Sequence, residues 1–201
     1  MKTLYIKSSP RGERSKSIEL GNHIIEKIGG EVIHLDLFNS YIPFLSEGVI
    51  AYNYGFGEYE GLSSEDKKIA DVQKEYIDQI KSSDNIVIAA PMWNFGLPGA
   101  LKTWFDLVLK INDTFAIENG NYIGLVKNIK KTIVVGARGG KYIDTPFAPY
   151  DNLTGPINLL LGFIGLEAKN FWLEGVNYAS GEQLALESLN IKGEIDSFIA
   201  A

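Results

Sequence analysis

Short apolar segments alternate with helical periodicities along the whole chain. Strands are expected at residues 3–7, 31–36, 85–90, 131–137 and 167–175. Helices are expected at residues 18–28, 64–80, 98–110, 153–165 and 182–200. The third strand, "NIVIAA", is apolar almost throughout, which is typical of a central parallel strand covered on both faces. The alternation therefore predicts an α/β fold, with a parallel sheet and helices on both of its faces.

Two segments interrupt this alternation. Residues 37–63 have little periodicity and many Tyr, Gly and Phe residues, and connections this long are usually functional or mobile. Residues 114–126 predict a small hairpin that turns at Asn119-Gly120. Neither segment resembles a linker, and the chain has no internal repeat, so residues 1–201 are expected to form one domain.

Charge and composition exclude several classes of function. A net charge of −6 disfavours binding to nucleic acid and to anionic membranes. The absence of cysteine excludes disulfides and thiolate nucleophiles, and no metal-ligand spacing accompanies the two His residues, so no metal site is expected. The apolar stretch at the N-terminus is too short for a signal peptide, and no run approaches the roughly 18 apolar residues of a membrane span. We therefore expect a cytoplasmic protein.

Three unusual loops follow strands of the predicted sheet, where α/β proteins bind ligands. We name them the serine loop (residues 8–17, "SSPRGERSKS"), the aromatic turn (residues 91–96, "PMWNFG") and the glycine loop (residues 137–142, "ARGGKY"). The serine loop offers the hydroxyls of Ser8, Ser9, Ser15 and Ser17 beside basic side chains. It ends at a helix N-terminus, whose free N–H groups favour an anion. It lacks the Gly-Lys-Ser/Thr ending of a Walker loop, and a single phosphate suits it better. An ordinary helix cap within a solvated basic loop is the alternative.

The aromatic turn carries large rings and no charge at the end of a strand. Beside a phosphate-binding loop, this composition suits a flat ring with a phosphate tail, with Trp93 and Phe95 packed on or next to the ring. The alternative is that Trp93, Phe95 and Trp104 belong to the hydrophobic core. Because no Ser-His-Asp arrangement is visible, a bound cofactor would explain how such a site performs chemistry.

Several segments, in order along the chain, resemble the FMN-dependent NADH-azoreductases, also described as NADH:quinone oxidoreductases. They are "KSSPRGERSKS", "APMWNFGLPGALKTWFDLV", "TFAIENG", "GLVKNIKKTIVV", "ARGG" and "GFIGLE". The resemblance implies a flavodoxin-like three-layer sandwich, whose five parallel strands have the order 2-1-3-4-5. It also implies a homodimer with FMN bound tightly but not covalently.

The resemblance also assigns roles to residues of this chain. It assigns the FMN phosphate to Ser9, Ser15, Lys16 and Ser17. It assigns the flavin ring to Pro91, Met92, Trp93, Asn94, Phe95, Ala137, Arg138, Gly139 and Gly140. Phe115 and Phe163 match positions that line the substrate cleft. The family commonly has Tyr in place of Trp93 and Ser in place of Ala137, and we expect these changes to affect substrate preference or flavin potential rather than binding.

The activity implied is a two-electron, ping-pong transfer of hydride from NADH through FMN to quinones and aromatic azo compounds. No side chain need be an essential acid or base, since the flavin carries the chemistry. We expect the glycine loop to favour negative charge on the reduced ring, through backbone N–H groups and the Arg138 cation. The alternatives are a flavodoxin-type electron carrier without its own substrate and a flavin store or sensor. Segments 37–63 and 114–122 favour the reductase, because both suit the closing of a cleft or a dimer.

Overall fold

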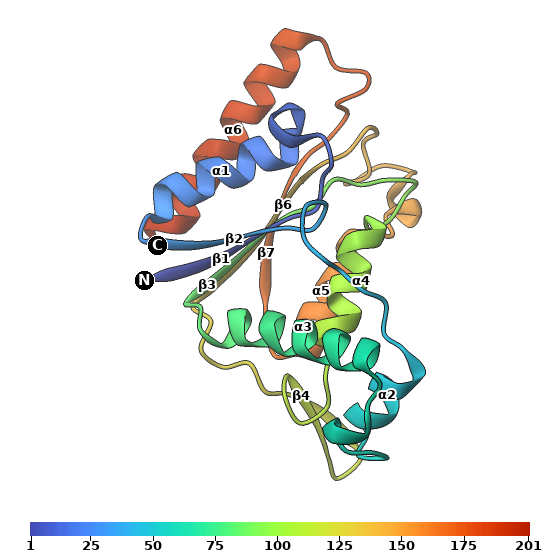
Figure 1. Ribbon diagram of the computed structural model, residues 1–201. Coiled ribbons are helices and arrows are strands. Elements are labelled where there is room, and N and C mark those ends of the chain that lie inside the picture. Colours follow the sequence, from blue (N-terminus) through green and yellow to red (C-terminus); the bar gives the residue numbers. More distant parts are fainter.

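A five-stranded parallel sheet forms the centre of the computed structural model, which describes residues 1–201 (Figure 1). Its strands are β1 (Lys2–Lys7), β2 (Glu31–Asp36), β3 (Asn85–Ala89), β6 (Lys131–Ala137) and β7 (Ala168–Leu173). They lie in the order β2-β1-β3-β6-β7, and every pairing is parallel. The predicted order 2-1-3-4-5 agrees with this sheet once the two strands of a separate hairpin are left out of the numbering.

Side chains alternate between two hydrophobic cores, one on each face of the sheet. Ile86 and Ile88 of β3 enter the larger core, whereas Val87 and Ala89 enter the smaller one. Helices α1 (Lys16–Ile28) and α6 (Gly181–Ala200) cover the smaller core. Helices α3 (Ser64–Lys81), α4 (Gly99–Val108) and α5 (Thr154–Phe163) cover the larger one (Figure 1). None of these helices is both long and apolar enough to cross a membrane.

The long segment between β2 and α3 contains a helix that the sequence analysis missed. Helix α2 (Glu47–Asn53) begins after Ser46, whose hydroxyl accepts a hydrogen bond from the Val49 N–H at 3.2 Å and donates one to Asp66 of α3. Val49 is fully buried in the larger core. Helix α2 is only two turns long, so its stability comes from this cap and contact with α3 rather than from periodicity. Single 3₁₀ turns are η1 (Gly12–Arg14), η2 (Tyr59–Gly61) and η3 (Ala148–Tyr150).

The predicted hairpin is confirmed. Strands β4 (Phe115–Glu118) and β5 (Asn121–Gly124) pair in antiparallel fashion, and both turn residues have positive φ, 52° at Asn119 and 78° at Gly120. The chain after β5 is held at the end of α5, where the Val126 N–H donates to the Ile164 carbonyl at 3.0 Å. Figure 1 shows the hairpin below α3, away from the loops that follow β1, β3 and β6.

Gly136 sets how closely β6 approaches its neighbours near the loops. A β-carbon at this position would lie 2.1 Å from the Ala90 carbonyl oxygen and 2.6 Å from the ring of Trp172. Since one of these atoms is backbone, a side chain can fit only if strands move apart.

We predict that Gly136→Ala lowers the free energy of unfolding by about 1–3 kcal/mol, because the added methyl group overpacks the sheet. Gly193→Ala is the matched control, since Gly193 is exposed within α6 and a β-carbon there would have no other atom within 4 Å. That control should raise the free energy of unfolding by about 0.5–1 kcal/mol. Denaturant titration measures both changes, and equal effects of the two variants would contradict the close approach at Gly136.

Candidate functional site

The serine loop begins with a residue that has a structural role. The backbone N–H and the hydroxyl of Ser8 both donate to the Ala89 carbonyl, at 3.0 and 2.8 Å. This pair of hydrogen bonds ties the end of β1 to the end of β3. Among the hydroxyls considered for an anion, Ser8 is therefore already used within the protein.

The remaining serines form a cradle at the N-terminus of α1. Ser15 caps the helix, and its hydroxyl accepts a hydrogen bond from the Ile18 N–H at 3.5 Å. Ser9 is 2% exposed, and its hydroxyl accepts only a long bond of 3.4 Å from the Arg11 N–H. The Ser17 hydroxyl is buried with no hydrogen-bond partner, and the backbone N–H groups of Lys16 and Ser17 also lack an acceptor in the chain. Unsatisfied donors at a helix N-terminus fit a phosphate group.

The Lys16 side chain is not directed solely to this cradle. Its ammonium group pairs with Glu19 at 2.8 Å, and the carboxylate of Glu19 also pairs with Lys192 of α6 at 2.9 Å. These bonds lower the pKa of Glu19, chiefly through the hydrogen bond from Lys16. The cradle therefore relies on hydroxyl and backbone N–H groups more than on a lysine charge.

The aromatic turn is a strained two-residue hairpin. Trp93 and Gly96 exchange backbone hydrogen bonds of 3.2 and 3.0 Å, and the residues between them have positive φ, 47° at Asn94 and 70° at Phe95. Asn tolerates this conformation, whereas Phe in it costs about 1–3 kcal/mol. The N–H groups of Asn94 and Phe95 have no acceptor in the chain. The turn thus presents an aromatic ring and two free donors at the end of β3.

The aromatic residues of this region divide between the site and the core. Phe95 is 55% exposed, and Trp93 is half-buried, with its ring 5.9 Å from that of Phe38. Trp104 is fully buried in the larger core beside Phe105. The core interpretation therefore holds for Trp104 and does not hold for Phe95.

The glycine loop offers further donors next to the aromatic turn. The Met92 N–H donates to the Ala137 carbonyl at 3.1 Å, which places the two segments side by side. The N–H groups of Gly139 and Gly140 have no acceptor in the chain, and both residues are half-buried. A β-carbon at Gly139 would lie 2.4 Å from the side-chain amide of Asn177. Glycine therefore suits position 139, because a side chain there would displace the amide of Asn177.

Arg138 differs from the free cation that the sequence analysis expected. Its side chain is 0% exposed, and one guanidinium nitrogen bonds both Asp151, at 2.9 Å, and Glu174, at 3.2 Å. The other terminal nitrogen donates to the Thr154 hydroxyl, and the group lies 4.1 Å from the centre of the Trp172 ring. The two carboxylates more than offset its charge, so the expected contribution of a free Arg138 cation to a bound ring is wrong.

Asp151 is the best-satisfied carboxylate of the site. One oxygen accepts the N–H groups of Leu153 and Thr154 at 3.0 Å each, and the other accepts from Arg138 and the Thr154 hydroxyl. Burial alone would raise its pKa, but these hydrogen bonds and the positive charge of Arg138 hold the pKa of Asp151 below its usual value. The carboxylate is therefore charged at neutral pH.

Asp151, Thr154 and Glu174 were not identified from the sequence. Glu174 follows directly on β7, next to the end of β6 in the sheet, and its side chain also accepts from the Tyr142 N–H at 3.0 Å. The available sequence signal for Glu174 was its position directly after a strand that neighbours β6. For Asp151 the signal was a capping residue just before a helix.

Phe115 and Phe163 lie together near the C-terminal ends of α4 and α5, far from the aromatic turn and the glycine loop. Their ring centres are 4.7 Å apart, and Tyr122 is 4.9 Å from Phe163. Helix α4 begins just after the aromatic turn and runs to Val108, before Phe115. Helix α5 begins at Thr154, beside Arg138, and ends at Phe163. Each helix has ten residues, so about 15 Å separates its ends. Within one chain the two rings do not meet the aromatic turn.

The sheet order, the cradle after β1 and the ring-presenting turn after β3 define a protein of the flavodoxin class. The model of the family described as flavodoxin-like fold matches residues 1–190. The FMN-dependent NADH-azoreductase from Bacillus anthracis strain Ames Ancestor, solved with FMN, superposes with a TM-score of 0.86 at 23% identity. That comparison covers 100% of this chain and 98% of the other, and it shows the shared fold.

Similarity to curated relatives identifies one family within the flavodoxin class. An FMN-dependent NADH:quinone oxidoreductase of Photobacterium profundum is 35% identical over 201 residues, which cover 98% of each chain. Another, from Nitratidesulfovibrio vulgaris strain DP4, is 34% identical over 168 residues and covers 81% of this chain and 80% of the relative. The chain belongs to the family of FMN-dependent NADH:quinone oxidoreductases.

The strained turn predicts that one substitution has opposite effects on the stability of the protein and on flavin binding. We expect Phe95→Gly to stabilise the ligand-free protein by about 1 kcal/mol, because Asn-Gly is the preferred pair for a turn with two positive φ values. The same change should weaken flavin binding, because it removes the exposed ring. Thermal unfolding and fluorescence titration with FMN measure the two effects. A Phe95→Gly variant that is less stable than wild type and binds FMN with unchanged affinity would contradict the assignment of strain to Phe95.

Proposed function

We propose that residues 1–201 form a single FMN-binding domain that acts as an NADH:quinone oxidoreductase and also reduces aromatic azo compounds. FMN, when bound, would supply the chemistry, a ping-pong transfer of hydride from NADH to the acceptor. The names of the curated relatives support this activity. The proposed reaction needs a flat, dry surface beside the ring and donors at its polar edge, and no acid or base from the protein.

One observation carries the proposal: the serine loop, the aromatic turn and the glycine loop each present unpaired donors at the carboxyl edge of the sheet. The Ser17 hydroxyl and the N–H groups at the start of α1 would hold the phosphate. The N–H groups of the aromatic turn and the glycine loop would face polar ring atoms, and Phe95 would pack on or next to the ring. Buried or half-buried donors that find no partner in the protein are typical of a ligand site.

A flavodoxin-type carrier without its own substrate is the second candidate. Carriers of this kind are usually shorter and strongly acidic around the flavin. Here Asp151 and Glu174 approach the glycine loop, and the single charge of Arg138 offsets one of the two carboxylates. The edge that would face the ring is therefore less negative than two free carboxylates would make it, which favours the enzyme.

We further propose a homodimer in which each chain completes the substrate cleft of the other. Phe115 and Phe163 lie at the far ends of α4 and α5, so they would reach a cleft beside an aromatic turn only if that turn belongs to a second copy. Large apolar side chains near them are exposed in the single chain, among them Tyr122 at 64% and Leu159 at 71%. Such exposure is typical of a surface that a partner covers.

The remaining partners would be small molecules, and the protein would work in the cytoplasm, where NADH is regenerated. The net charge of −6 supports the proposal that neither nucleic acid nor a membrane is a partner.

The cofactor assignment has a direct test. Purified protein should be yellow, and heat denaturation should release FMN rather than FAD, because only one phosphate cradle is present. Chromatography of the released cofactor identifies it, and NADH oxidation with and without an added quinone separates the enzyme from the carrier. Protein that is colourless and cannot be reconstituted with FMN would overturn the proposal.

The shared cleft predicts complementation between two defective chains. One variant, Ser17→Glu, places a negative charge in the phosphate cradle, and the other, Phe115→Ala with Phe163→Ala, removes the aromatic pair. Each should be nearly inactive alone. Dissociation and reassembly of an equal mixture should restore about one quarter of wild-type activity, because half of the dimers are mixed and each has one intact site. Mixtures that stay inactive despite mixed dimers on native mass spectrometry would show that each cleft belongs to one chain.

A further inference from the structure

We propose that Arg138 is a positioning residue that holds the aromatic turn and the glycine loop at a fixed spacing through its buried pairs with Asp151 and Glu174. The inference rests on the proposed function, because it takes these two segments as the flavin site. It assigns to Arg138 a role through other residues rather than a contact of its charge with the ring.

Burial makes the pairing of Arg138 obligatory. A fully buried guanidinium is tolerated only when carboxylates and hydrogen bonds replace its water shell. Here Asp151, Glu174 and Thr154 bond the two terminal nitrogens, Nε has no partner, and the Trp172 ring lies 4.1 Å from the cation. The Arg138 backbone is also engaged, since its N–H donates to the Leu173 carbonyl at 2.8 Å. Arg138 is thus a fixed point at the end of β6.

The first branch from this point fixes the glycine loop. Besides Arg138, the Glu174 carboxylate accepts the Tyr142 N–H at 3.0 Å and the Ile143 N–H at 3.2 Å. These bonds hold the chain directly after Gly140. The free N–H groups of Gly139 and Gly140 therefore lie between two anchored points, Arg138 and Tyr142.

The second branch reaches the aromatic turn. Asp151 is held by Arg138 and by the N–H groups of Leu153 and Thr154 at the start of α5. The next residue, Asn152, donates its backbone N–H to the Tyr150 carbonyl at 3.0 Å and to the Phe95 carbonyl at 2.9 Å. This bond lies outside the hairpin and holds the residue whose φ of 70° is strained. Strained conformations persist only where the surroundings constrain them, and the Asp151–Asn152 peptide supplies such a constraint.

The two branches start from one guanidinium nitrogen, which bonds both carboxylates. A change at Arg138 therefore removes one support of the glycine loop and of the aromatic turn together. Loss of Asp151 releases the turn from the same point. The donors of the two segments face one ring only if their spacing is kept, so either change should alter flavin affinity and the potential of the bound flavin.

The test is a double-mutant cycle on the intact protein, read by FMN titration and by the midpoint potential of the bound flavin. Arg138→Met keeps bulk without charge, and Asp151→Asn keeps the acceptor that caps α5. We expect each single variant to raise the dissociation constant of FMN about tenfold, as loss of a supporting residue commonly does. The double variant should also show about a tenfold change rather than about a hundredfold, because both changes break one path. Arg138→Lys should recover part of the loss.

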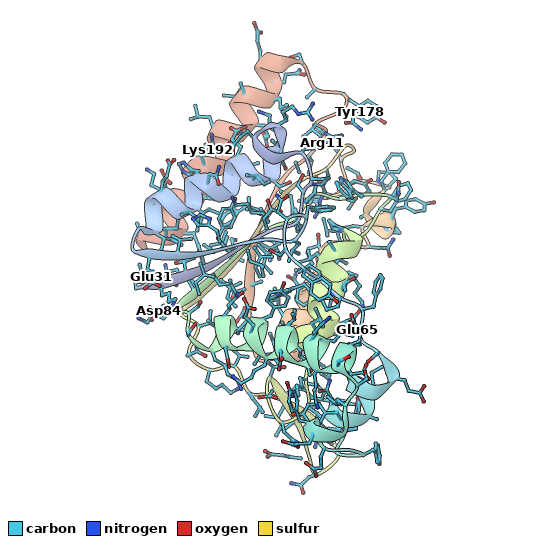
Figure 2. The ribbon with its side chains drawn as sticks, in the orientation of Figure 1. Arg11, Glu31, Glu65, Asp84, Tyr178 and Lys192 are labelled. Atoms are coloured by element: carbon cyan, nitrogen blue, oxygen red, sulfur yellow. The ribbon has the colours of Figure 1, made fainter.

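Asp84→Asn is the matched control. Asp84 accepts the Lys2 N–H at 2.8 Å and pairs with Lys130 at 3.2 Å, at the end of the sheet away from the loop that carries Arg11 (Figure 2). Asp84→Asn should lower the unfolding temperature of the protein without changing its affinity for FMN or the midpoint potential of the bound flavin. The proposal would be overturned if the effects of Arg138→Met and Asp151→Asn on the dissociation constant of FMN multiply. It would also be overturned if both variants leave FMN affinity and flavin potential unchanged.

Hydrogen exchange separates this inference from the proposed function. In ligand-free Asp151→Asn, the Asn152 amide should exchange faster than in wild type, while amides of β3 remain protected. This measurement needs no flavin, so it decides the coupling even if wild-type protein fails to bind FMN, a failure that would sink the proposed function alone. If Arg138→Met does not fold, Glu174→Gln takes its place, with faster exchange expected at the Tyr142 and Ile143 amides. Unchanged exchange in these variants would refute the coupling.

Discussion

The burial of β3 on both faces is the constraint on which the rest of the structure depends. Each of its residues is buried, so apolar layers must cover the strand from both sides. Helices α1 and α6 provide one layer, and α3, α4 and α5 provide the other. Parallel strands then end at one edge, and the chain must leave that edge by loops at β1, β3 and β6. The candidate site is thus a consequence of how the central strand is covered.

Much of this architecture follows from local sequence. The five strands, the main helices and the hairpin at Asn119-Gly120 have periodicities or turn residues that reveal them, and the structure confirms them. Helix α2 was missed because contact with α3 stabilises seven residues that lack a long apolar stripe. The serine loop was found for a similar local reason, since hydroxyls before a helix are visible in sequence. The structural role of Ser8 in that loop was not predicted, because its acceptor, the Ala89 carbonyl, lies 81 residues away in the sequence.

The environment of Arg138 shows where sequence reasoning fails. Its partners Asp151 and Glu174 lie 13 and 36 residues further along the chain. Nothing in "ARGG" distinguishes a cation exposed to a ligand from one enclosed by carboxylates. The serine loop, the aromatic turn and the glycine loop contain Glu13 as their one acidic residue, yet two carboxylates reach the end of β6 in space. The sign of the charge at such a site is therefore a property of the fold rather than of the motif.

The unpaired Ser17 hydroxyl has a consequence for the lifetime of the protein in the cell. A buried polar group without a partner costs about 1–3 kcal/mol, and a phosphate that accepts its hydrogen bond removes that penalty. A ligand that binds only the folded state adds to stability in proportion to the logarithm of its concentration. Empty chains would unfold more often and be degraded sooner than filled ones. The abundance of the protein would then follow the supply of the molecule that fills its cradle, without any dedicated regulator.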